Sequence, residues 1–181
     1  VPGNHDRYVR QAVGNDLYNK YFGEFFGKSE IHMRRLKDDW VIVGWDSAHP
    51  NNWLSASGTV RRSTLQATEN LLLSCPAETR FIIVNHYPLT FPEGWEFDQL
   101  HELYNLVPVR NWILRHPQIR LYLHGHIHEN WLHRLPRDSG PELLLVNSAS
   151  STSKLYSEQK SSFHQIDLED SNVRVSPILL N

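Results

Sequence analysis

The 181-residue sequence contains a single cysteine, Cys75, so no disulfide bond can form within the chain. Such a chain fits a reducing compartment, and we expect a cytoplasmic protein. No run of about 18 or more apolar residues occurs, so the sequence predicts no transmembrane helix. The formal net charge is −2, which provides no general basic field, and we expect no nucleic-acid partner.

Internal repeats, low-complexity tracts and linker-like segments are also absent from the sequence. Hydrophobic residues make up 40% of the chain and charged residues 21%, a balance that allows one well-packed core. We therefore predict a single domain over residues 1–181. The first residue is Val1 rather than methionine, so the sequence leaves open a targeting segment ahead of it.

A dense group of histidines follows a short apolar run. His124, His126 and His128 lie close together, and imidazole is the commonest side-chain ligand of metals. The run over residues 119–123 favours a strand, and ligand sites in open α/β sheets lie beyond the carboxyl ends of strands. Gly125 allows the chain to turn sharply there. We interpret this group as a metal site, and the alternative is a set of surface histidines without function.

Hydrophobic patterning predicts strands and helices in alternation along much of the chain. The predicted strands are short apolar or alternating runs between turn-forming residues, at 30–36, 40–45, 81–84, 119–123, 131–135, 143–146, 163–168 and 173–178. Predicted helices cover residues up to Gly27 from a cap at Asn15 or Asp16, then 61–74, then one or two segments within 98–116. We expect Pro108 to break the last region, and Tyr21 and Phe22 to lie in the core.

Further ligand-type side chains follow other predicted strand ends or turns. Asn4, His5 and Asp6 come directly after the turn-forming pair Pro2-Gly3. Such a run is an ordinary turn more often than a site. His86 follows the predicted strand at 81–84, and although a lone histidine is more often structural, this one repeats the position of the histidine group.

Three short blocks, in this order, resemble conserved blocks of the calcineurin-like metallophosphoesterase superfamily. They are Gly3-Asn4-His5-Asp6, His86-Tyr87-Pro88 and Gly125-His126-Ile127-His128. The resemblance implies an α/β fold, a four-layer sandwich of two mixed β-sheets flanked by helices, here without its first strands. The segments at 45–47 and 146–148 are similar to the bacterial branch that contains class III cyclic-nucleotide phosphodiesterases.

The resemblance also implies a site for two metal ions. Asn4, His86 and His126 are expected to bind the second ion, and His128 the first. Neutral imidazole and amide ligands leave the ion pair strongly electropositive, which suits a phosphate ester. Mixed nitrogen and oxygen ligation favours Mn, Fe or Zn over Mg or Ca.

His5 and Asp6 are the residues that the resemblance implies for proton transfer. His5 is expected to act as the general acid that protonates the leaving alkoxide, or to stabilise the transition state. Asp6 is expected to orient the His5 ring through its nitrogen. The reaction implied is in-line attack on phosphorus, and the expected substrate is a phosphodiester or a nucleotide-like small molecule.

The sequence departs from the family pattern at its start. Two earlier family blocks, Asp-x-His and Gly-Asp-x-x-Asp, complete the first metal position, and neither occurs in this chain. We expect the sequence to be a fragment of a complete enzyme, with a genuinely shortened protein as the other reading. The alternatives left open are a phosphomonoesterase, a pyrophosphatase and a non-catalytic protein-binding scaffold with an incomplete metal site.

Overall fold

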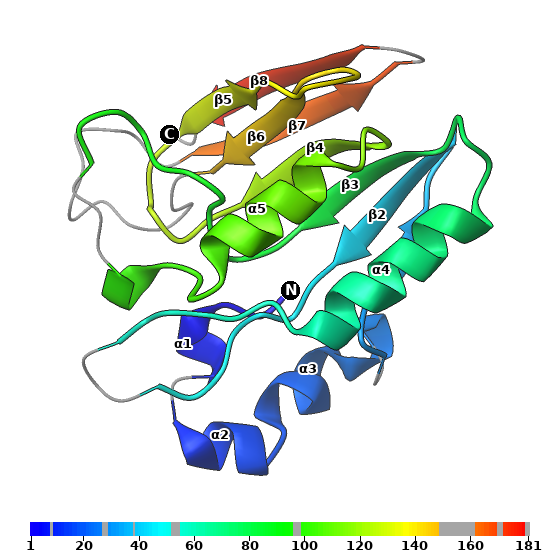
Figure 1. Cartoon of the computed structure of the whole chain (residues 1–181). Helices are drawn as coiled ribbons and strands as arrows, with labels where there is room; N and C mark the ends of the chain where they lie inside the picture. The colour runs from blue at the N-terminus through cyan, green and yellow to red at the C-terminus, as the bar shows by residue number, and fades with distance from the viewer. Residues whose placement is uncertain are drawn as a thin grey trace.

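Four parallel strands form the centre of a six-stranded sheet in the computed structural model of the chain (Figure 1). The strand order is β1-β2-β3-β4-β6-β5, and the two outer strands, β1 and β5, run antiparallel to their neighbours. The strands span His32–Arg35 (β1), Trp40–Gly44 (β2), Arg80–Val84 (β3), Ile119–His124 (β4), Trp131–Leu135 (β5) and Leu143–Asn147 (β6). Each lies on a predicted strand, so those predictions are confirmed.

The structure describes residues 1–7, 9–26, 29–37, 39–51, 55–95, 99–148, 162–169 and 172–179. Its helices are α1 (Asn4–Arg7), α2 (Arg10–Gly14), α3 (Leu17–Phe26), α4 (Arg62–Ser74), the 3₁₀ turn η1 (Gln99–His101) and α5 (Leu106–Leu114). A second sheet is the antiparallel hairpin of β7 (Ser162–Leu168) and β8 (Val173–Leu179).

Helices α4 and α5 cover one face of the six-stranded sheet (Figure 1). Thr64, Thr68 and Leu72 recur every four residues along α4, so all three lie on the face that is buried. Helix α5 contributes Trp112 and Ile113 to the same core, against residues of the four central strands. This face holds the larger of the two hydrophobic clusters.

The hairpin of β7 and β8 packs on the opposite face of the sheet. Ile166 and Val175 of the hairpin contact the cluster that contains Trp40, Leu121 and Leu144. Because both faces of the central strands are covered, those strands are apolar without alternation, and β6 is buried along its whole length. The predicted α/β class, with two sheets and flanking helices, is confirmed.

Two sequence-based predictions about helices were wrong. Pro108 does not break a helix, because it lies in the first turn of α5, where no backbone N–H is needed for an intrahelical bond. In α3, Tyr18 is buried, but Tyr21 and Phe22 are exposed to solvent, at 68% and 46%. The amphipathic pattern there identified the helix correctly, although only part of its apolar face reaches the core. No helix within the described ranges is long and apolar enough to cross a membrane.

Gly58 joins three segments that run beside the edge of the sheet. Its backbone pairs with Ala48 and with Leu103. A side chain at this position would meet the ring of Tyr87 and come within 2.7 Å of the Ser47 carbonyl oxygen. We expect Gly58→Ala to lower the free energy of unfolding by about 2 kcal/mol or more, as overpacked cores do.

Urea unfolding monitored by circular dichroism would measure this loss. Gly14→Ala is the matched control, because an added methyl group there meets nothing within 4 Å. We expect that control to leave stability unchanged or raise it by about 0.5 kcal/mol. Equal stability of the two variants would contradict this account of Gly58.

Candidate metal centre

The parallel strands bring three chain segments together at the carboxyl edge of the sheet. His86 follows β3 and His126 follows β4, and these strands pair in register up to Val84 and Leu123. The pairing continues past the strand ends, where the Gly125 amide donates to the His86 carbonyl at 3.2 Å. Helix α1 lies at the same edge (Figure 1). The predicted ligand segments therefore meet in space.

Three atoms that could donate an electron pair to a metal ion, here called the three donors, lie close together in this centre. The Nε2 atom of His86 lies 2.8 Å from Oδ1 of Asn4 and 3.0 Å from Nδ1 of His126. The other ring nitrogen of His126, Nε2, lies 2.7 Å from the His101 carbonyl oxygen. The two imidazole rings meet edge to face, with their centroids 4.9 Å apart. Asn4, His86 and His126 thus form one contact group.

The hydrogen-bond pattern determines which lone pairs face the middle of the group. Because a carbonyl oxygen can only accept, Nε2 of His126 must carry a proton and donate it to His101. In the neutral ring, Nδ1 of His126 is then an acceptor. The amide oxygen of Asn4 is also an acceptor, so two lone pairs point at Nε2 of His86. One N–H of His86 must serve both, and a cation at this position would satisfy all three atoms together.

Burial keeps both imidazoles neutral. Burial first, and then charge on neighbouring histidines, lowers the pKa of His86 to about 3. For His126, burial also dominates and lowers the pKa to about 4, against the opposing effect of the His101 carbonyl. Neutral imidazole is the form that binds metals, so both rings are in the ligating state at neutral pH.

Close packing holds the His86 ring in this position. A Cβ atom on Gly3 would lie 2.9 Å from two atoms of the ring, so the backbone of the Gly3 block approaches the imidazole as only glycine allows. On its other side the fully buried Tyr87 ring packs edge-on, 5.0 Å between centroids, and also lies 4.9 Å from His126. These contacts leave the imidazole little room to rotate.

The remaining predicted residues are His5, Asp6 and His128. His5 and His128 are exposed, and both lie close enough to His86 to lower its pKa. His126 and His128 have φ angles of 74° and 56°, so the chain turns there instead of alternating as in a strand. The carboxylate of Asp6 accepts a hydrogen bond from the Gly3 amide at 2.8 Å. The expected contact between Asp6 and His5 stays a prediction.

Comparisons with known proteins assign the chain to a family. A family model described as calcineurin-like phosphoesterase matches residues 1–130. The chain belongs to the calcineurin-like phosphoesterase family. The crystal structure of a dimetal phosphatase from Danio rerio is similar to this calcineurin-like chain, with a TM-score of 0.51 and 14% sequence identity over 81% of this chain and 52% of that one. Our chain thus spans about half the length of that phosphatase. The curated proteins include no match.

The donor set of this calcineurin-like chain fits a metal ion through two imidazoles and an amide. Among the described residues, no group of three or more His, Cys, Asp or Glu side chains could hold an ion. The third donor here is the amide oxygen of Asn4, which such a group does not include. Amide oxygen and imidazole nitrogen together suit first-row transition metals. His101 was not predicted, because a backbone carbonyl has no signature in the sequence.

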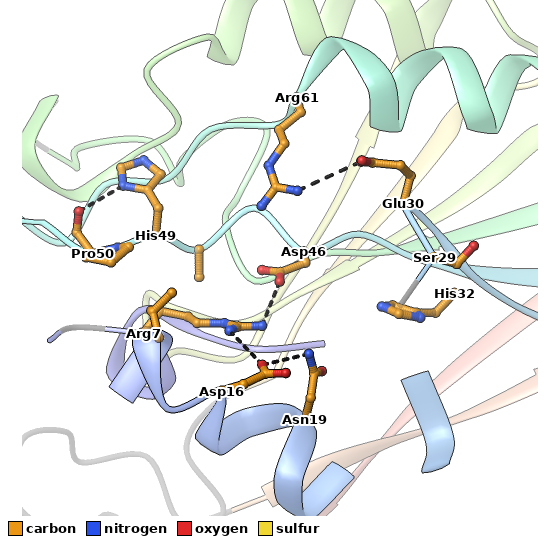
Figure 2. A pocket seen from close by; sticks show the side chains of 12 residues that line it. Arg7, Asp16, Asn19, Ser29, Glu30, His32, Asp46, His49, Pro50 and Arg61 are labelled. Atoms are coloured by element: carbon orange, nitrogen blue, oxygen red, sulfur yellow. Dashed lines mark hydrogen bonds and ion pairs between the residues drawn. The ribbon is translucent and has the colours of Figure 1, made fainter. Parts of the chain in front are cut away.

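Arg7 anchors the helix that carries Asn4. The two residues lie one turn apart on the buried face of α1. The Arg7 guanidinium lies between Asp46 and Asp16 in the wall of a cavity (Figure 2). Its distance is 2.9 Å to the Asp46 carboxylate and 4.0 Å to that of Asp16, and the cavity volume is about 350 Å³. The guanidinium also lies 5.3 Å from the centre of the Tyr18 ring. The arginine therefore joins α1 to the end of β2 and to α3, contacts that the sequence motifs did not indicate.

The pair of Arg7 and Asp46 leads to a stability prediction. We expect Asp46→Asn to lower the free energy of unfolding by about 2 kcal/mol, because it removes the nearer counter-charge of a largely buried guanidinium and leaves only Asp16, at 4.0 Å. Chemical denaturation followed by tryptophan fluorescence would measure the change.

The matched control is Glu30→Gln, the same carboxylate-to-amide change in the same cavity. Glu30 lies 3.9 Å from Arg61, and both side chains are about half exposed. A pair in that setting contributes about 1 kcal/mol or less. Our account of the anchor is wrong if the two variants lose equal stability.

Proposed function

We propose that the protein is a metal-dependent phosphoesterase with a two-metal site, acting on phosphodiester or nucleotide-like small molecules. The observation that carries the proposal is the convergence of Asn4 Oδ1, His86 Nε2 and His126 Nδ1. Membership of the calcineurin-like phosphoesterase family supports the reaction class. The similar dimetal phosphatase supports the use of metal ions.

The side chains divide between holding ions and handling protons. Asn4, His86 and His126 would hold one ion, and His128 would contribute to the other. When bound, the ions supply positive charge for the phosphoryl oxygens and activate a water molecule for attack. We propose Mn, Fe or Zn, since nitrogen and oxygen donors are mixed.

His5 is the proposed general acid, and Asp6 its partner. The His5 ring is exposed, so a substrate can reach it from solvent, and it lies one residue from the ligand Asn4. A proton given to the leaving oxygen there would avoid the formation of a free alkoxide. Asp6 stands at the start of α1, where its carboxylate also caps the Gly3 amide.

The composition of the chain supports proposals for its binding partner and its location in the cell. A small phosphoester is the expected substrate, and no nucleic acid is expected as a partner, because the net charge of −2 gives no broad basic field. We propose a cytoplasmic location on the basis of the single cysteine.

Metal binding tests the site independently of turnover. We expect the purified chain to retain zinc after dialysis and the variants His86→Ala and His126→Ala to lose that zinc, measured by mass spectrometry of metal content. His133→Ala is the control, since His133 lies on the edge strand β5 and stacks on Trp131. Equal zinc content in the unmodified chain and all three variants would contradict the proposed site.

Hydrolysis of bis(p-nitrophenyl) phosphate tests the reaction. His5→Ala should keep the metal content and reduce turnover by about 100-fold or more, as expected for loss of a general acid. Turnover that survives His5→Ala would remove the proton-transfer role. A chain that stays metal-free and inert even when it is extended upstream would favour the non-catalytic scaffold.

A further inference from the structure

A chain of buried polar side chains lies directly behind the metal centre. It consists of Ser47 after β2, Asn85 after β3 and Tyr122 within β4, and we call it the Asn85 relay. All three residues are almost fully buried, with 2% or less of their surface exposed. Burying a polar group costs free energy unless the group is hydrogen-bonded, so the hydrogen bonds of these three side chains indicate what they hold in place.

Asn85 sits at the middle of the relay and uses both ends of its amide. Its Oδ1 accepts from the Ser47 hydroxyl and, at 2.8 Å, from the backbone N–H of His86. Its Nδ2 donates to the Tyr122 hydroxyl at 2.8 Å. That hydroxyl in turn donates to the Tyr87 carbonyl at 2.7 Å.

Only one direction of these hydrogen bonds is possible. The Tyr87 carbonyl can only accept, so the single proton of the Tyr122 hydroxyl is committed to it. The hydroxyl oxygen must then accept from Asn85, which places the NH₂ group of the amide toward Tyr122 and its oxygen toward His86. Tyr122 therefore holds the Asn85 amide in the orientation that the His86 N–H also requires.

The relay fixes the backbone on both sides of the ligand His86. The N–H of His86 is held by Asn85, and the carbonyl of the next residue, Tyr87, is held by Tyr122. The His86 carbonyl is held separately by the Gly125 amide. With two of its own backbone groups and the following carbonyl fixed, His86 directs its side chain toward Asn4.

We propose that Asn85 and Tyr122 are positioning residues for the ligand His86, acting through its backbone. This inference rests on the proposed metal function. A purely structural role would change stability alone, whereas a positioning role also changes the affinity for metal. Groups that orient metal ligands typically change affinity about 10-fold to 100-fold when removed.

Tyr122→Phe tests the proposal, because it removes one hydroxyl and keeps the ring. The matched control is Thr68→Val, on the other side of the core. The Thr68 hydroxyl is also fully buried, accepts from Trp45 Nε1 at 3.0 Å and donates to the Thr64 carbonyl at 2.8 Å. Each variant thus removes one buried hydroxyl that both donates and accepts.

The measurement is the dissociation constant of Zn²⁺, obtained by competition with a chromogenic chelator. The zinc still bound by His86→Ala is subtracted from each titration, since it is bound by other histidines. We expect Tyr122→Phe to weaken zinc binding about 10-fold or more, and Thr68→Val to change it less than about 2-fold. Amide hydrogen exchange should also accelerate at His86 in Tyr122→Phe alone.

The outcomes separate the inference from the function. Zinc binding that is lost in His86→Ala but unchanged in Tyr122→Phe would overturn the positioning role and leave the metal site intact. Zinc binding unaffected by His86→Ala would overturn both. If Tyr122→Phe does not fold, Ser47→Ala removes a single bond to Asn85, and unchanged zinc affinity in that variant would count equally against the relay.

Discussion

The parallel register between β3 and β4 is the constraint on which the rest of this molecule depends. It brings the residues after both strands to the same edge, and the bond from the Gly125 amide to the His86 carbonyl extends the pairing beyond the sheet. A shift of this register would separate the two imidazoles, because one follows each strand. The covering helices and the second sheet stabilise the strands, while the strand ends decide where chemistry can occur.

Around that edge, each donor is directed by a different kind of interaction. Asn4 depends on the ionic anchor of its helix through Arg7. His86 depends on close approach of Gly3 and on bonds to its backbone. His126 depends on a carbonyl that selects its tautomer. Three kinds of interaction thus converge on one small group of ligand atoms.

Much of this arrangement could be predicted from the sequence, because strand patterns and ligand motifs are both local. The apolar run at 81–84 and the histidines after residue 123 identified the strands and the edge of the sheet. The partners Asp46, His101 and Asn85 could not be predicted in the same way. Their roles come from contacts between segments far apart in the chain, or from a backbone atom that every residue has.

The same limit explains the errors in α3 and α5. An apolar face predicts burial only if another element covers it, and the exposed Tyr21 and Phe22 show that periodicity contains no information about the neighbour. The prediction for Pro108 was wrong because a proline breaks a helix only beyond its first turn. Sequence patterning locates the start of a helix only to within a few residues.

The spacing of the three donors along the chain has a consequence for folding. Asn4 and His86 are 82 residues apart, and His86 and His126 are 40 apart, so no short segment contains the site. Contacts this distant form late, after the entropy of closing long loops has been overcome. An ion held by all three donors would therefore bind the native chain and not its folding intermediates. By mass action it would draw the population toward the completed sheet.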